Sequence, residues 1–254
     1  MLLQDKVAVI YGASGAIGGA VAREFAREGA RVFLTARNFD AIDALAKAIT
    51  SEGGRAEVAV VDALDEASIE RHAAEVVEKT GRIDVSMNTV GFDVVQGVPL
   101  TELRLEDFIA PITTWTTTQF LTARITARQM VEQRSGVVLV QSSSPARLAL
   151  AQTAGFGVAC AAVEGLARTL AAELGAYGVR VVSVRPHRIA DTLGPEADFA
   201  MGVDEFRTHI ESLTLLNRLP TLREVAATAA FLASDKAGAM TGAVANLTCG
   251  MSID

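Results

Sequence analysis

A cluster of glycines near the N-terminus has the clearest chemical meaning in this sequence. Gly12, Gly15 and Gly18 lie between an apolar segment, Lys6–Tyr11, and a helical pattern at Ile17–Glu28. Glycines in this position let the backbone turn tightly and approach a pyrophosphate, whose charge is stabilised at the helix N-terminus. An ordinary tight turn is the alternative, but the place between the first strand and the first helix favours dinucleotide binding.

A hydroxyl, an imidazole and a thiol farther along the chain are the candidate reactive groups. Ser143 is the middle of three serines that follow an apolar segment, and capping of the strand end accounts for two of the three. His187 could act as a general acid or base, although a solvent-facing loop histidine is the simpler interpretation. Cys160 has no adjacent Lys or His to lower the pKa of its thiol, so we interpret it as a buried, small hydrophobic residue.

Segments with strand and helix patterns alternate along the chain and must position these groups. This order predicts an α/β fold in one domain, residues 1–254, with a parallel sheet of about seven strands and helices on both faces. We expect a break or bend near Pro111 in the longest helix. The irregular region Pro186–Met201 should lie at the carboxyl edge of the sheet, where such sheets bind ligands. The predicted strands are Lys6–Tyr11, Arg31–Ala36, Arg55–Val61, Ile83–Asn88, Val137–Ser142, Val179–Arg185 and Val244–Leu247, and the helices are Ile17–Glu28, Asp40–Glu52, Glu66–Thr80, Leu103–Gln133, Ala154–Leu174 and Leu222–Ser234.

Composition limits the classes of partner. The chain has 254 residues and a net charge of -7, without a basic stripe, so we expect no nucleic-acid partner. No apolar run reaches the ~20 residues of a membrane-spanning helix, so we expect no membrane partner. Cys160 and Cys249 make no disulfide framework, which favours the cytoplasm. His72 and His209 are interpreted as solvated helix residues, and no cluster has the spacing of metal ligands.

Over nearly its whole length the chain resembles the short-chain dehydrogenase/reductase family. The family's Thr-Gly-x-x-x-Gly-x-Gly loop corresponds to residues 11–18, where Tyr11 and Ala16 replace two of its four named positions. Asn88-Thr-Val-Gly stands where Asn-Asn-Ala-Gly is usual, and residues 161–166, 171–174, 177–181 and 218–225 resemble later family blocks. The resemblance implies a Rossmann-type doubly wound sheet, an oxidoreductase acting on a small molecule, and a homodimer or homotetramer built on Leu103–Gln133 and Ala154–Leu174.

The resemblance also implies which residues bind the dinucleotide. Asp62 corresponds to the family's contact to adenine, and Pro186 precedes the loop that flanks the nicotinamide. The implied cofactor-binding residues are Gly12, Ser14, Gly15, Ala16, Ile17, Gly18, Arg37, Asp62, Ala63, Asn88 and Pro186.

The choice between NADP and NAD depends on the end of the second strand. Enzymes that prefer NAD usually place an acid there, against the ribose 2′-hydroxyl. This chain has Arg37 instead, whose guanidinium matches the geometry of a 2′-phosphate, although a solvated arginine at a helix start is the alternative. We therefore expect NADP, with NAD as the second choice.

The catalytic residues that the resemblance implies are largely replaced. In the family, a Tyr protonates the carbonyl oxygen, a Lys four residues later lowers the pKa of that Tyr, a Ser binds the substrate oxygen, and an Asn supports a relay water. Ser143 retains the Ser, but Phe156 stands at the Tyr and Cys160 at the Lys. Trp115 corresponds to the Asn, in an alignment that can slip within residues 113–118. Loss of a general acid typically costs ~10²–10⁴ in rate, so we expect very slow carbonyl reduction.

Three functions stay open from the sequence. The first is an oxidoreductase that uses NADP without Tyr and Lys, with Ser143, His187 or the substrate itself moving protons. The second is a non-redox enzyme on the same fold. The third is a catalytically silent dinucleotide-binding or scaffold protein. Fold alone does not choose among them.

Overall fold

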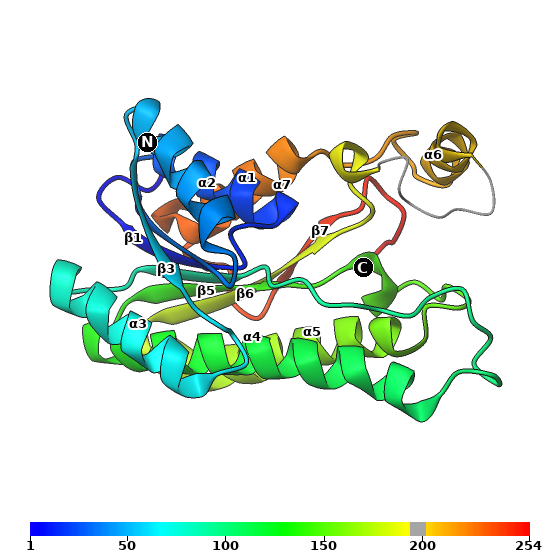
Figure 1. Cartoon of the computed structure of the whole chain (residues 1–254), viewed down its shortest axis with the longest axis horizontal. Coiled ribbons are helices and arrows are strands. Elements are labelled where there is room, and N and C mark those ends of the chain that lie inside the picture. Colours follow the sequence, from blue (N-terminus) through cyan, green and yellow to red (C-terminus); the bar gives the residue numbers. More distant parts are fainter. Residues whose placement is uncertain (194–201) are drawn as a thin grey trace.

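One seven-stranded parallel sheet runs through the computed structural model, which describes residues 1–193 and 202–254 (Figure 1). The strand order is β3-β2-β1-β4-β5-β6-β7. Because the order reverses direction between β1 and β4, their carboxyl ends form a topological switch point. The strands are β1 (Val7–Tyr11), β2 (Arg31–Ala36), β3 (Arg55–Val60), β4 (Val85–Asn88), β5 (Gly136–Gln141), β6 (Val179–Pro186) and β7 (Val244–Leu247).

Helices cover both faces of the sheet, which confirms the predicted α/β architecture (Figure 1). One layer holds α1 (Ala16–Arg27), α2 (Phe39–Ser51) and α7 (Leu222–Ala233). The other holds α3 (Glu66–Thr80), α4 (Leu105–Gln133) and α5 (Ala154–Leu174). A further helix, α6 (Val203–Ser212), stands apart from the two layers at one end of the molecule.

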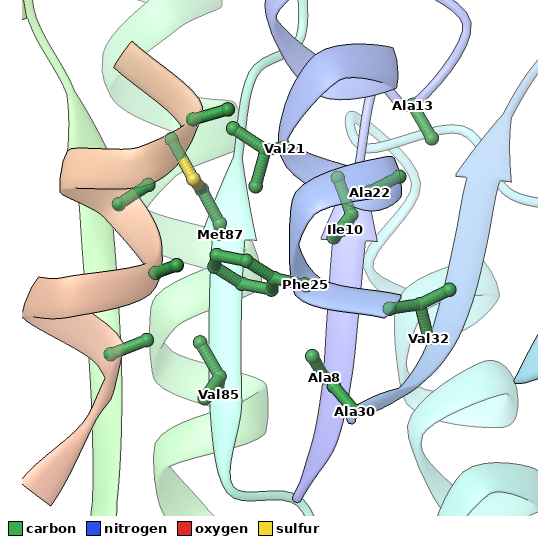
Figure 2. Packing of buried hydrophobic residues seen from close by; sticks show 14 of the residues in the cluster. Ala8, Ile10, Ala13, Val21, Ala22, Phe25, Ala30, Val32, Val85 and Met87 are labelled. Atoms are coloured by element: carbon green, nitrogen blue, oxygen red, sulfur yellow. The ribbon is translucent and has the colours of Figure 1, made fainter. Parts of the chain in front are cut away.

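The core lies on both sides of the sheet because successive strand residues point to opposite faces. In β1, Ile10 packs in the layer of α1 and α7, whereas Val9 packs in the layer of α3 to α5. Figure 2 shows Val21 and Phe25 of α1 lying over Met87 of β4. Burial on both faces explains why the strands are almost continuously apolar. It also holds the carboxyl ends of β1 and β4 in place by packing from both sides.

The structure corrects three sequence predictions. The long helix has no break at Pro111, because α4 continues from Leu105 to Gln133. Helix α6 was not predicted, and residues 194–201 of the predicted irregular region lie outside the described residues. His72 is only 5% exposed and its ring contacts Tyr11 and Phe33 edge-on, so it is a core residue and not a solvated one.

One described helical segment, Ala154–Tyr177, is long and apolar enough by composition to cross a membrane. In this fold α5 packs against α4 and β6 and contributes Val163 and Ala167 to the core. A core helix of a globular protein passes the same test of length and composition, so the segment is weak evidence for a membrane span.

Candidate functional site

The turn between β1 and α1 is packed tightly against the loop that follows β4. Gly12 has a φ of +79°, and a Cβ added there would lie 2.7 Å from the carbonyl carbon of Thr89. A Cβ at Gly18 would lie 2.5 Å from both the carbonyl oxygen of Gly12 and Oγ1 of Thr89. Thr89 in turn donates its hydroxyl to the carbonyl of Tyr11, at 2.9 Å. The two glycines are therefore required by backbone geometry, which brings both loops together at the switch point.

A cavity of about 550 Å³, which we call the nucleotide cleft, opens beside this turn. Ser14 and Arg37 line it as exposed side chains from the ends of β1 and β2. Asp62 lines it after β3 and accepts a hydrogen bond from the Leu64 amide, at 2.9 Å. Helix α1 starts at this cleft without a side-chain cap, so its first amides are available to an anion. The sequence-predicted residues that line the cleft are Gly12, Ser14, Gly15, Arg37, Asp62 and Ala63.

A second cavity of about 440 Å³, the reaction cavity, adjoins the nucleotide cleft. The two share Gly15 and the loop 89–92 as lining, so together they form one continuous depression at the carboxyl edge. The sequence-predicted residues that line the reaction cavity are Gly15, Ala16, Ile17, Trp115, Ser143, Phe156, Pro186 and His187.

Three aromatic rings form one wall of the reaction cavity. Trp115 and Phe156 stack with an interplanar angle of 12° and 5.7 Å between ring centroids. The Phe92 ring lies 4.9 Å from Trp115 and 6.1 Å from Phe156. Phe92, which comes soon after β4, was missed by the sequence analysis, although its place just beyond a strand end was a usable signal. None of the three rings carries a phenolic hydroxyl that could act as a proton donor.

Cys160 lines neither cavity. It is completely buried in α5, and burial, with the Glu164 carboxylate second, raises the pKa of its thiol to about 12. At neutral pH the thiol is therefore protonated, which makes it a poor nucleophile. The geometry agrees with the interpretation of Cys160 as a small hydrophobic residue.

A buried ion pair, which the sequence analysis missed, adjoins the reaction cavity, whose lining includes the neighbouring residues Ser142 and Pro186. Arg185 at the end of β6 donates to both carboxylate oxygens of Glu164 in α5, at 2.7 and 2.9 Å. The two side chains are 2% and 4% exposed. Ser142 donates its hydroxyl to the same carboxylate at 2.8 Å, and Asp254 accepts a further bond from Arg185 at 2.5 Å. The network joins α5, β6, the residue that follows β5, and Asp254.

His187 is buried against a serine, which makes the interpretation as a solvent-facing loop residue wrong. Its ring is 8% exposed, and Nδ1 lies 2.7 Å from Oγ of Ser144. Burial, with the Arg188 charge second, lowers the pKa of His187 to about 4. The imidazole is therefore neutral at pH 7. Its Nε2 has no hydrogen-bond partner among the described residues.

Asn88 and Gly18 position the site without lining it. Asn88 is buried, donates to Thr122 at 3.0 Å and accepts from the amide of Val90 at 2.9 Å, so it orders the loop after β4. Neither Tyr11, which is fully buried, nor the exposed Tyr177 lines either cavity, and no lysine is among the described residues that do so. No group of His, Cys, Asp or Glu among the described residues could hold a metal ion.

Comparisons with known proteins agree with this geometry. A model of the family described as Enoyl-(Acyl carrier protein) reductase matches residues 12–252. D-threitol dehydrogenase of Mycolicibacterium smegmatis is 32% identical over 241 residues, which are 95% of this chain and 90% of that protein. A gluconate 5-dehydrogenase from Burkholderia cenocepacia, solved with NADP and tartrate, is 25% identical and has a TM-score of 0.88, covering 98% of this chain and 96% of that one.

A solved short-chain dehydrogenase/reductase from Serratia marcescens is 28% identical and has a TM-score of 0.87, with 100% of both chains covered. The match of the family model and the matches to relatives extend over almost the whole chain, and the sheet has the topology expected of that family. This chain therefore belongs to the short-chain dehydrogenase/reductase family of oxidoreductases.

Proposed function

We propose that this protein binds NADP(H) in the nucleotide cleft but does not reduce carbonyl compounds by the family's Tyr and Lys route. The observation that carries the proposal is the glycine cradle. A Cβ at Gly18 would lie 2.5 Å from the carbonyl oxygen of Gly12, so only glycine lets the turn pack this tightly, and the uncapped first amides of α1 stay open to the nucleotide cleft. A bound dinucleotide would supply or accept a hydride. Gly12, Ser14 and Gly15 would hold its pyrophosphate, and Asp62 its adenosine side.

The preference for NADP over NAD rests on Arg37. The residues that end and follow β2, Ala36, Arg37 and Asn38, include no acid to accept a ribose 2′-hydroxyl. The Arg37 side chain is exposed and lines the cleft, where its guanidinium can pair with a 2′-phosphate. NAD is the second choice of cofactor.

The absence of the usual chemistry rests on the aromatic wall. Phe156 occupies the Tyr position and stacks on Trp115, so the ring beside the cavity has no hydroxyl to give a proton. Cys160 at the Lys position is buried away from both cavities. Loss of a general acid costs about 10²–10⁴ in rate, so ordinary ketone reduction should be very slow.

A second candidate function is a reductase in which Ser143 and His187 contact the substrate oxygen. The bond between Ser144 and Nδ1 of His187 favours it, because it fixes the ring beside the cavity. The neutral imidazole would polarise the oxygen by a hydrogen bond and would not give up a proton at neutral pH. A non-redox enzyme and a silent dinucleotide-binding protein are the remaining alternatives.

Titration with NADPH and NADH, followed by a ketone-reduction assay, tests the proposal. We expect NADPH to bind below millimolar concentration and reduction to be undetectable over a broad ketone panel. Gly18→Ala should abolish binding, whereas Gly175→Ala is the control, because no atom lies within 4 Å of an added Cβ there. Failure of both cofactors to bind would contradict the first half of the proposal, and reduction at ordinary rates would contradict the second.

We further propose that the protein is a cytoplasmic homodimer or homotetramer that acts on a small molecule and contacts neither nucleic acid nor membrane. Helices α4 and α5 expose large apolar side chains, including Phe120 and Val158 at 40% and 45%. Association of such faces around a two-fold axis would bury them. Light scattering at micromolar concentration tests this, and a strictly monomeric mass would contradict it.

A further inference from the structure

Arg188 gives the reaction cavity a positive charge. It follows His187 in the loop after β6, and its exposed side chain is among the residues that line the cavity. As far as the structure describes the chain, it is the one charged residue in that lining, because no Asp, Glu or Lys is there and His187 is neutral at pH 7. Asp62 and Asp93 line the neighbouring nucleotide cleft and not this cavity. The charge of the reaction cavity therefore suits an anion.

Contacts with α6 hold Arg188 and its loop in place. The guanidinium carbon of Arg188 lies 5.2 Å from the ring centroid of Phe206. Arg207, also on α6, donates to the carbonyl of Ala190, two residues after Arg188, at 2.9 Å. A cation–π contact uses the flat face of a guanidinium, whereas its five N–H donors point outward in its plane. The edge of the Arg188 guanidinium can thus bind a carboxylate while its face stays on Phe206.

The same cavity has an apolar wall. Phe92 and Phe156 line it as half-buried side chains, and the half-buried Ile17 and Val94 add to this lining. Trp115 packs against both phenyl rings but is only 3% exposed, so it leaves little surface of its own to a ligand. Covering the two phenyl rings with an apolar group is favourable. A ligand with both an anionic group and an apolar body matches these two features.

The number of positive charges distinguishes between classes of anion. A carboxylate carries one charge and matches the donors of one arginine with two parallel hydrogen bonds. A phosphate monoester carries about 1.5 to 2 charges at pH 7. No second Arg is among the described residues that line the reaction cavity, so the additional charge of a phosphate would lose water without compensation. A monocarboxylate is therefore the better match.

We propose that the reaction cavity binds a small monocarboxylate with an apolar body, whose carboxylate accepts from Arg188 and whose body packs on Phe92 and Phe156. Arg188 is then the residue that determines specificity for an anionic ligand. The inference rests on the proposed function only because it places this ligand beside the dinucleotide. Arg188 and Phe156 line the reaction cavity and not the nucleotide cleft, so the carboxylate can be tested with and without the cofactor.

Four probes of similar size separate charge from shape. Hydrocinnamate carries a phenyl ring and a carboxylate, hydrocinnamamide has a neutral amide in place of the carboxylate, phenylpropylamine is a cation at pH 7, and phenyl phosphate carries the larger negative charge. Each is titrated by calorimetry at low ionic strength, with and without NADPH. The indole N–H of Trp115, the single tryptophan of the chain, gives one resonance in a proton–nitrogen spectrum, and it reports whether binding takes place at this cavity.

We expect hydrocinnamate to shift the Trp115 resonance saturably and to bind about tenfold more tightly than the amide, because a charge-assisted hydrogen bond is about twice as strong as a neutral one. Phenylpropylamine should not bind. Added sodium chloride should weaken hydrocinnamate and leave the amide nearly unchanged. Arg188→Gln should remove the preference for hydrocinnamate over the amide. Arg71→Gln is the matched control, because Arg71 is exposed on α3 and lines neither cavity.

Phe156→Ala tests the apolar half of the proposal. It should weaken hydrocinnamate and its amide alike, by about fivefold to tenfold, and leave the ratio of their affinities unchanged. Phe120→Ala, which removes an exposed ring outside the cavity, should change neither affinity. Unchanged affinities in Phe156→Ala would show that the apolar body does not lie on this wall.

Three results would overturn the assignment of the anionic group. The first is failure of hydrocinnamate to bind, with or without NADPH. The second is binding of the amide, or of phenyl phosphate, at least as tight as that of hydrocinnamate. The third is an unchanged preference in Arg188→Gln. Binding of hydrocinnamate through Arg188 to a protein that does not bind NADPH would instead contradict the proposed function alone. Thermal unfolding identifies a variant that fails to fold, and the comparison of the four probes on the wild-type protein, with its salt dependence, then decides the inference.

Discussion

The nucleotide cleft and the reaction cavity lie side by side at one edge of the sheet, yet they are built differently. The cleft is shaped largely by backbone, because Gly12 and the uncapped start of α1 border it and Gly18 keeps the turn tight without lining it. Exposed side chains such as Arg37 complete its lining. In the reaction cavity, side chains contact each other, as Trp115 does with Phe156 and Ser144 with His187. The comparison teaches that backbone geometry can shape one cavity at the edge of the sheet while packing of side chains shapes the cavity beside it.

The largest expected effect comes from breaking the ion pair beside the reaction cavity. Glu164→Leu removes the bidentate partner of the buried Arg185 guanidinium and leaves it only the half-exposed Asp254 carboxylate. Loss of one partner of a buried ion pair typically costs about 3–5 kcal/mol. Chemical denaturation should therefore show a large fall in the free energy of unfolding. The double variant Glu164→Leu with Arg185→Met should recover much of it, because an apolar pair of similar volume avoids the unpaired charge.

Asp43→Asn is the matched control for that experiment. It breaks the exposed pair that Asp43 forms with Lys47, and we expect little change in stability. Equal losses of unfolding free energy in Glu164→Leu and Asp43→Asn would show that the buried network contributes no more to stability than a surface ion pair does.

The second expected effect is a gain of activity. Phe156→Tyr together with Cys160→Lys restores the general acid and its ammonium partner, and it should raise NADPH-dependent ketone reduction by about 10²-fold or more. Neither single change should suffice, because Tyr alone keeps a pKa near 10 and Lys alone puts a charge in an apolar site.

Trp115 is the control in that experiment, because it stacks on Phe156 and narrows the site. A silent double variant is therefore tested again with Trp115→Asn added. If the triple variant folds, binds NADPH and still reduces no ketone, the replaced residues are not what disables reduction. The contrast between the two regions would then need another explanation.

Sequence patterns identified the glycine turn but not the side-chain contacts around the reaction cavity, for a physical reason. The glycine turn is contiguous and lies between a strand and a helix, so local rules find it. The bounds of α3 and α5 were likewise predicted without error from their periodic patterns. In contrast, Ser144 and His187 are 43 residues apart, and Glu164 and Arg185 are 21 apart. Such pairs depend on tertiary packing, which no local pattern records.

The third expected effect is a dependence of stability on pH. The folded state lowers the pKa of His187 to about 4, whereas the unfolded chain has the ordinary value near 6.5. Between these values the unfolded state binds the proton and the folded state does not, so stability rises with pH and levels off above about 6.5. Lowering the pH from 7 to 5 should cost about 2 kcal/mol through this residue.

His187→Phe should remove that part of the slope in denaturation curves measured between pH 5 and pH 7. His72, whose pKa burial also lowers to about 4, keeps a similar dependence in the variant and serves as the internal reference. An unchanged slope would mean that His187 is not buried as a neutral ring.

The smallest expected effect concerns Arg37, and it tests whether the nucleotide cleft selects its ligand by a side chain as well as by backbone. A charge-assisted hydrogen bond to a 2′-phosphate is worth about 1.5–3 kcal/mol, so NADPH should bind at least about tenfold more tightly than NADH. Arg37→Ala should weaken NADPH binding by about that factor and leave NADH binding nearly unchanged. Arg23 on α1 lines neither cavity, so Arg23→Ala is a control for general loss of positive charge. If Arg37→Ala weakens the binding of NADPH and of NADH equally, the arginine acts on the pyrophosphate, which both cofactors carry. Specificity for the 2′-phosphate would then have to come from another group at the cleft, such as Ser14.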